Sequence, residues 1–89
     1  MSEISKQNQE KIKEEILLVL YENTPKALHT SKISGLIIRD EEFTLKLLEE
    51  LEKQNLVVKV NKNTLGMNYL ARKRWKLSKE VYDAYKGLV

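Results

Sequence analysis

Eight basic side chains and no acidic one lie between residues 53 and 79 of this sequence. The eight are Lys53, Lys59, Lys62, Arg72, Lys73, Arg74, Lys76 and Lys79. Ammonium and guanidinium groups form strong hydrogen bonds with phosphate and carboxylate oxygens, and this stretch has no carboxylate that could neutralise them. A lysine-rich face that only improved solubility would have acids among the lysines. The stretch therefore predicts contact with a polyanion.

The charge is divided unevenly along the whole chain. Residues 1–52 carry 7 basic and 11 acidic side chains, whereas residues 53–89 carry 9 basic and 2 acidic ones. The net charge of +3 for all 89 residues hides this separation. Such a separation concerns association with a partner rather than the choice of fold. We therefore expect the polyanion to bind mainly at the carboxy-terminal part.

Catalytic and metal-binding chemistry has little support in the sequence. Cysteine is absent, which removes thiolate metal ligands and cysteine nucleophiles, and His29 is the only histidine. A single histidine without clustered carboxylates indicates a surface or capping role rather than a metal ligand. No glycine-rich phosphate-binding motif is present. We expect no enzymatic activity, no metal and no cofactor.

Length and apolar content predict one intracellular domain. Domains usually have about 50–250 residues, so the chain is long enough for a single domain, residues 1–89. The longest apolar run, residues 16–21, is far shorter than the roughly 20 residues of a membrane-spanning helix. The first residues lack the apolar stretch of a signal peptide. We expect a cytoplasmic protein with no membrane partner.

The spacing of apolar residues predicts helices and two strands. Helices are expected over residues 6–23, 31–38, 41–54 and 79–88, and strands over 56–60 and 72–77 with a long loop between them. Thr30, Asp40 and Ser78 are natural caps for the last three helices. Gly35 weakens a helix interior, so we expect another helix to pack closely against its backbone. In the first helix, Lys13 is expected on the polar side.

The second strand combines an apolar face with a basic one. Side chains alternate along a strand, so Lys73, Trp75 and Leu77 share one face, and the other face carries Arg72, Arg74 and Lys76. The three cations then lie about 6.8 Å apart, which is close to a multiple of the phosphate repeat in nucleic acid. Trp75 is interpreted as a core residue in preference to a base-stacking one.

Three segments in order resemble the winged helix-turn-helix family of DNA-binding domains. TSKISGL (residues 30–36) is similar to the first helix of the helix-turn-helix, and TLKLLEELEKQNLV (44–57) to the recognition helix and first wing strand. WKLS (75–78) is similar to the second wing strand and the cap of a carboxy-terminal helix. Asn55 stands where the family usually has glycine. The resemblance covers about residues 10–88.

The resemblance implies an α+β, mainly helical fold with three helices, a two-stranded wing and a carboxy-terminal helix. It also implies a small transcriptional regulator that binds double-stranded DNA through the helix-turn-helix and the basic wing. The residues expected to contact DNA are Ser31, Lys32, Arg39, Thr44, Lys46, Lys59, Lys62, Arg72, Lys73, Arg74 and Lys76.

The third helix leaves a second reading open. Residues 40–52 carry six acidic side chains and one lysine, and carboxylates repel phosphates. The alternative is a winged-helix module that binds another protein through this acidic helix, because a fold does not fix a function. A variant that binds RNA is a further possibility. A homodimer would use the apolar sides of the first and last helices, including Ile4, Tyr82, Tyr85 and Leu88.

Overall fold

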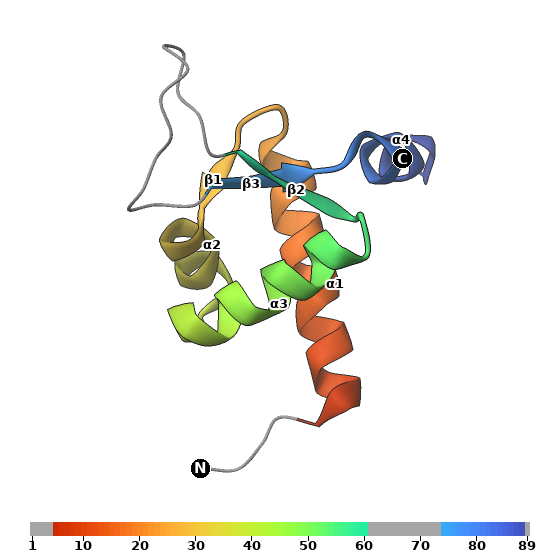
Figure 1. Ribbon diagram of the computed structural model, residues 1–89. Coiled ribbons are helices and arrows are strands. Elements are labelled where there is room, and N and C mark those ends of the chain that lie inside the picture. The colour runs from red at the N-terminus through yellow and green to blue at the C-terminus, as the bar shows by residue number, and fades with distance from the viewer. Residues whose placement is uncertain (1–4, 61–73, 89) are drawn as a thin grey trace.

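The computed structural model describes residues 5–60 and 74–88. In chain order, the elements are α1 (Lys6–Asn23), β1 (Leu28–His29), α2 (Thr30–Ile37), α3 (Glu41–Lys53), β2 (Val57–Val60), β3 (Arg74–Leu77) and α4 (Lys79–Leu88). Helices α1, α2 and α3 gather on one side of a small sheet, and α4 extends away from them (Figure 1). The mainly helical α+β class expected from the sequence is confirmed.

Helix α1 begins and ends as its sequence predicts. The Ser5 hydroxyl accepts a hydrogen bond from the Asn8 amide, and Thr24 closes the helix before Pro25, which has no N–H to continue it. Ile16 and Leu20 form the buried side. Lys13 is buried with them, so its expected place on the polar side is wrong. It precedes these residues by three and seven positions, and that spacing puts all three on one helix face.

Helices α2 and α3 are joined by a short turn with a left-handed residue. Ile38 has φ 56°, and the Arg39 amide after it donates to the Ser34 carbonyl at 3.0 Å. A helix that ends with this hydrogen bond usually has glycine in the left-handed position. An L-residue such as Ile38 in that conformation costs roughly 1–2 kcal/mol of folding free energy. Asp40 then caps α3, because its carboxylate accepts from the Phe43 amide at 3.0 Å. The predicted Asp40 cap is confirmed.

The sheet contains a strand that the sequence analysis did not predict. Strand β1, only two residues long, pairs antiparallel with β3, and β3 pairs antiparallel with β2, which gives the order β1-β3-β2. Trp75 lies opposite Leu28 on one side and Lys59 on the other. Residues directly opposite in a sheet point to the same face. Lys59 therefore shares the inner face with Trp75.

Trp75 lies at the centre of the core, as predicted. Its side chain is fully buried, and its indole N–H donates a 2.8 Å hydrogen bond to the Thr30 hydroxyl. The expected cap role of Thr30 is wrong, because α2 already includes Thr30 and the cap position is His29. The Thr30 hydroxyl instead satisfies a buried donor, which would otherwise carry a desolvation cost.

The structure shows the backbone conformation of Asn55 and the space around Gly35. Asn55 has φ 62°, so it adopts the left-handed conformation just after α3, at the position where the resembled family usually has glycine. A Cβ added to Gly35 would meet no atom within 4 Å, so the close helix packing expected there is wrong. The backbone at Gly35 faces open space on an exposed part of α2.

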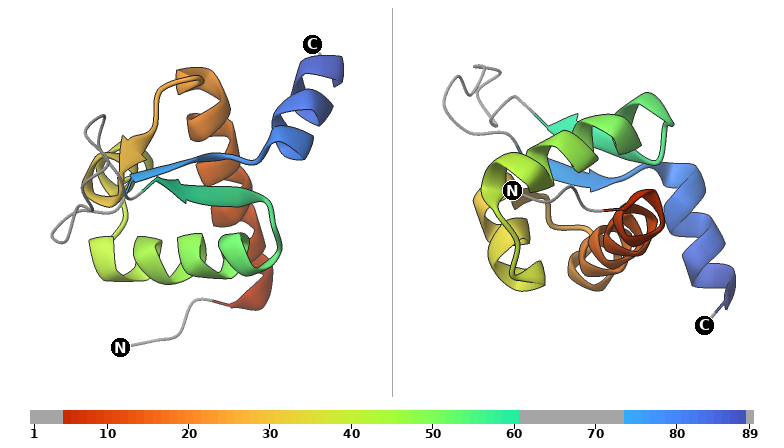
Figure 2. Two further views of the ribbon diagram at one scale, coloured as in Figure 1. Left: turned by 45° about the horizontal axis from the view of Figure 1, so that its top comes forward. Right: turned by 90° about the horizontal axis from the view of Figure 1, so that it is seen from below.

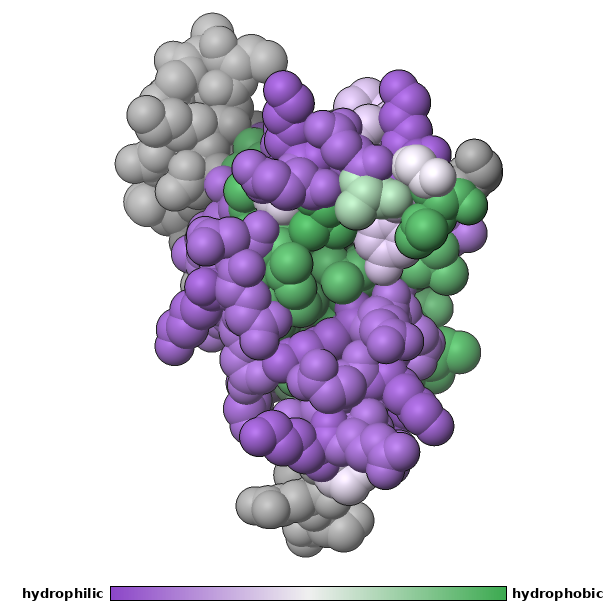
Figure 3. All heavy atoms as spheres, turned by 90° about the vertical axis from the view of Figure 1, so that its right-hand side faces the viewer, coloured by the Kyte–Doolittle hydropathy of each residue, from purple (hydrophilic) through white to green (hydrophobic). Residues whose placement is uncertain are grey.

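Helix α4 packs lightly on the rest of the protein. The Ser78 hydroxyl accepts from the Val81 amide at 3.4 Å, as expected for its cap, but no residue of α4 is buried. Tyr82 and Tyr85 contact Tyr21 of α1, with ring centroids 5.8 and 5.4 Å apart. Figure 2 shows α4 leading away from the sheet, and apolar surface is visible on the side where α4 lies (Figure 3). Among the described residues, no helix is long and apolar enough to cross a membrane.

Candidate nucleic-acid interface

The start of α3 presents exposed side chains of both charges. Glu41, Glu42 and Lys46 are exposed there, and Leu45 is half-buried. Arg39 is exposed in the turn just before. Behind them, the buried residues of α3 pack into the core and fix the helix in place. This arrangement leaves one side of α3 open to a partner.

Thr44 is not part of that open side. It is fully buried, and its hydroxyl donates to the Asp40 carbonyl at 2.8 Å. The expectation that Thr44 contacts DNA is therefore wrong. Thr44 lies three and four residues before Leu47 and Leu48, so it belongs to the apolar stripe of α3.

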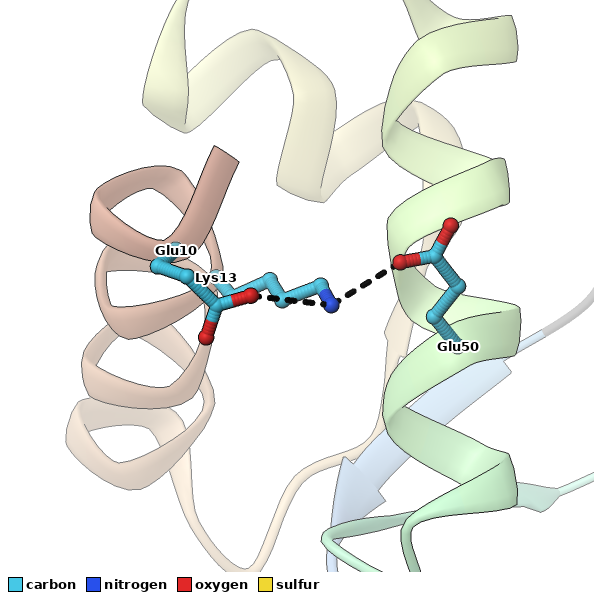
Figure 4. A network of polar contacts seen from close by, with 3 residues as sticks. All are labelled: Glu10, Lys13 and Glu50. Atoms are coloured by element: carbon cyan, nitrogen blue, oxygen red, sulfur yellow. Dashed lines mark hydrogen bonds and ion pairs between the residues drawn. The ribbon is translucent and has the colours of Figure 1, made fainter. Parts of the chain in front are cut away.

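Two of the six acidic residues of this region contact the protein's own lysines. Glu50 Oε1 lies 2.8 Å from Lys13 Nζ of α1, and Lys13 also reaches Glu10 Oε2 at 3.3 Å (Figure 4). Glu52 Oε1 lies 3.9 Å from Lys59 Nζ of β2. The carboxylate repulsion expected along α3 is reduced at these two positions.

Lys13 and Glu50 hold each other in their charged forms. The hydrogen bond from Lys13 lowers the pKa of Glu50 below its ordinary 4.5, although desolvation opposes the change. The same bond raises the pKa of Lys13 above 10.5, again against desolvation by burial. This pair was not expected from the sequence. The available signal was a lysine on the apolar stripe of α1, since a buried lysine needs a partner.

The start of α2 brings several polar groups together. Ser31 and Lys32 are exposed in its first turn, where helix amides and the helix dipole favour anions. His29 precedes them and lies directly opposite Arg74 of β3. Both side chains are partly buried, and within the described structure Nδ1 of His29 has no hydrogen-bond partner. Arg74 is thus placed beside the start of α2.

Lys76 is placed elsewhere. It lies opposite Val58, near the end of β3 that leads to α4. There it lines an open cleft of about 330 Å³ with Lys79, Tyr82 and the hydroxyl-bearing residues Thr24 and Ser78. Arg74 and Lys76 thus face the same side of the sheet, as predicted, but have different neighbours.

Lys59 does not extend the basic face as expected. It lies on the inner face of the sheet, with Nζ 5.6 Å from the centre of the Trp75 ring, and it contacts Glu52. The positive charge of Lys59 is therefore partly neutralised by Glu52 within the protein. Lys62, Arg72 and Lys73 lie outside the described residues, and the described part of the chain contains no group of three His, Asp or Glu side chains that could hold a metal.

Known proteins resemble this chain in structure but not in sequence. No protein-family model matches it, and no curated protein matches it. A mutant of MepR from a multidrug-resistant S. aureus clinical isolate superposes with a TM-score of 0.70 at 18% identity, over 89% of this chain and 54% of MepR. A mutant of ZitR from Lactococcus lactis, in its apo form, gives 0.70 at 21% identity, over 92% of this chain and 57% of ZitR.

A third similar structure contains DNA. The S. aureus MepR–DNA complex gives a TM-score of 0.68 at 19% identity, over 92% of this chain and 69% of MepR. The chain has the winged helix-turn-helix fold. In this fold, α2 and α3 form the helix-turn-helix, and β2 and β3 form the wing. The chain spans little more than half the length of the MepR and ZitR mutants, and identities this low establish the fold alone.

Proposed function

We propose that this protein binds double-stranded DNA in the cytoplasm and acts as a transcriptional regulator. The proposal rests chiefly on three cations of the helix-turn-helix: Lys32, Arg39 and Lys46. All three are exposed, and none forms an ion pair with any described residue. Exposed cations that form no internal ion pair are available to neutralise phosphates. Known proteins with this fold include the DNA-bound MepR and a MarR-family transcriptional regulator, which support the same proposal.

In the proposed complex, the two ends of the helix-turn-helix have different roles. Residues at the start of a recognition helix meet base edges in the major groove, which assigns Arg39 and Lys46 to sequence preference. Lys46, which lies farther along the helix, would also neutralise a phosphate. Ser31 and Lys32 would hold a phosphate at the start of α2, with Arg74 beside them. The remaining wing cations, Lys62, Arg72 and Lys73, would contact adjacent phosphates.

A salt titration tests the proposed DNA binding. Fluorescence polarisation of a random-sequence duplex is measured with the full chain at increasing salt concentration. If about four cations each neutralise a phosphate, the log–log slope of affinity against salt is near −3.6. Single- and double-stranded RNA serve as competitors. An affinity that does not change with salt, or a stronger preference for RNA, would contradict the proposal.

The alternative, protein binding through the acidic α3, has less support. Glu50 and Glu52 are engaged by Lys13 and Lys59, so the acidic face is smaller than the sequence suggests. Exposed Lys46 also interrupts it. Weak binding to every duplex at low salt would favour this alternative.

We further propose that two copies pair through α1 and α4. Leu88 is 83% exposed on α4 and Leu18 is 47% exposed on α1, and half-buried Tyr85 lies on α4 as well. Burying such side chains against a second copy would remove apolar surface from water. Light scattering should give the mass of a dimer. Leu88→Ser should shift it toward the monomer, whereas Gln7→Ser, a change of an exposed polar residue of α1, should not. Ile4 lies outside the described residues.

A further inference from the structure

Lys13 is an unusual residue for a helix that faces the core. Its side chain is 9% exposed, yet its ammonium group is held between two carboxylates from different helices. The contact with Glu50 is the shorter of the two, 2.8 Å against 3.3 Å for Glu10. The Glu50 side chain is 37% exposed, so this carboxylate lies at the boundary between the α1–α3 contact and solvent. Lys13 therefore fixes a carboxylate that other groups could also reach.

Two further lysines lie within reach of Glu50 on its own helix. Lys46 precedes it by four residues and Lys53 follows it by three, and both spacings bring side chains together on one helix face. Lys46 is the only cation of α3 before the last turn. It is exposed and forms no ion pair with the residues that the structure describes.

We propose that Lys13 occupies the Glu50 carboxylate and thereby keeps Lys46 available for a DNA phosphate or base. The inference rests on the proposed DNA binding and adds a residue that acts from outside the interface. Without Lys13, the Glu50 carboxylate of α3 would lose the cation that lies 2.8 Å from it. Lys46, which is exposed and precedes Glu50 by four residues, would then pair with it. Lys13 is in this sense a positioning residue for α3, since it touches no nucleic acid itself.

The salt dependence of DNA binding measures the number of available cations. Lys13→Met should reduce the magnitude of the log–log slope by about 0.9, the share of one phosphate contact. Adding Glu50→Gln to Lys13→Met should restore the slope, because the carboxylate that captures Lys46 is gone. Lys46→Met should reduce the magnitude of the slope in the wild type. In the Lys13→Met protein, Lys46→Met should cause no further reduction.

A matched control separates this effect from a simple loss of charge. Lys11→Met removes the same charge from α1, two residues away, but Lys11 is exposed and has no ion pair among the described residues. The salt slope of the Lys11→Met protein should equal that of the wild type. An equal loss of slope in both variants would overturn the proposal. Circular dichroism confirms that each variant is folded, and Lys13→Gln replaces Lys13→Met if the latter does not fold.

A second experiment needs no DNA. The titration midpoint of the Glu50 carboxyl group is followed by NMR in the free protein. Lys46→Met should raise this midpoint more in the Lys13→Met background than in the wild type, because only there does Lys46 hold the carboxylate. If Lys53→Met has the larger effect instead, Glu50 turns toward Lys53 and the proposal is wrong.

The two experiments distinguish the two possible failures. A wild-type protein that shows no salt-dependent DNA binding contradicts the proposed function. The Glu50 titration still decides whether Lys13 keeps Lys46 and Glu50 apart. Conversely, salt-dependent binding whose slope is unaffected by Lys13→Met overturns only the role of Lys13.

Discussion

Gly35 is a residue whose replacement should stabilise the protein. It lies inside α2, is exposed, and has open space where a Cβ would stand. Glycine in a helix interior costs about 0.5–1 kcal/mol relative to alanine, mainly through backbone entropy. Gly35→Ala should therefore raise the unfolding free energy by about this amount, measured by urea denaturation. Gly87→Ala, which also meets no atom but lies at the end of α4, should gain less. A destabilised Gly35→Ala protein would contradict this account of α2.

The Lys13–Glu50 pair should make stability depend on pH in a defined direction. The folded-state pKa of Glu50 is lowered, so its contribution is present above 4.5 and is lost as the pH falls through the folded value. The pKa of Lys13 is raised, so its contribution is present below 10.5 and is lost as the pH rises through the folded value.

Glu50→Gln tests this direction. At about pH 7 the variant should be less stable than the wild type by about 1 kcal/mol, because Glu50 is partly exposed and solvent screens the pair. Toward pH 3 the difference should shrink, since the Glu50 carboxylate of the wild type takes up a proton as the pH falls through its lowered folded-state pKa. Urea denaturation at both pH values measures it, and Glu14→Gln, which changes an exposed carboxylate of α1 with no ion pair among the described residues, is the control. A difference that grows in acid would refute the assignment.

Local sequence patterns were sufficient to predict the helices but not the complete sheet. Apolar spacing and capping side chains determine where α1, α3 and α4 lie, because their hydrogen bonds join residues that are close in sequence. Strand β1 has only two residues and exists because β3 pairs with it. No local signal indicates a partner that far along the chain.

The candidate site was predictable to a similar extent. The exposed positions of Ser31, Lys32 and Lys46 follow from helix periodicity, and that of Arg39 follows from its place in a turn. All four residues are exposed in the structure. Thr44 and Lys13 were misplaced because they are polar, although their spacing from buried apolar residues puts them on the buried sides of α3 and α1. Lys59 could not be separated from the basic face until its register opposite Trp75 was known.

The Trp75–Thr30 hydrogen bond connects the wing to the helix-turn-helix. Thr30→Val keeps the shape of the side chain but leaves the buried indole N–H without its acceptor. Such a loss costs about 1–3 kcal/mol. Denaturation followed by Trp75 fluorescence should show this destabilisation. Thr30→Ser, which keeps the hydroxyl, should lose much less. Equal stability of the valine variant and the wild type would mean that the hydrogen bond contributes little.

Across the whole molecule, the sheet separates the described wing cations between two ends. The start of β3, with Arg74, lies on the side of α2 and the start of α3, whereas its other end leads to α4 (Figure 1). Lys76 lies near that second end, in a cleft with Lys79 and Tyr82. A duplex held by the helix-turn-helix would approach the first end.

Arg74 and Lys76 should therefore differ in their importance for DNA, although both belong to one strand of four residues. Arg74→Met should weaken binding to all sequences and reduce the magnitude of the salt slope by about 0.9. Lys76→Met removes the same charge about 6.8 Å further along the strand, and its slope should change less. Polarisation titrations of both variants on one duplex make the comparison, with circular dichroism to confirm folding. If Lys76→Met has the larger effect, the duplex lies across α4 and the end of β3 that leads to it, and the helix-turn-helix is not the main contact.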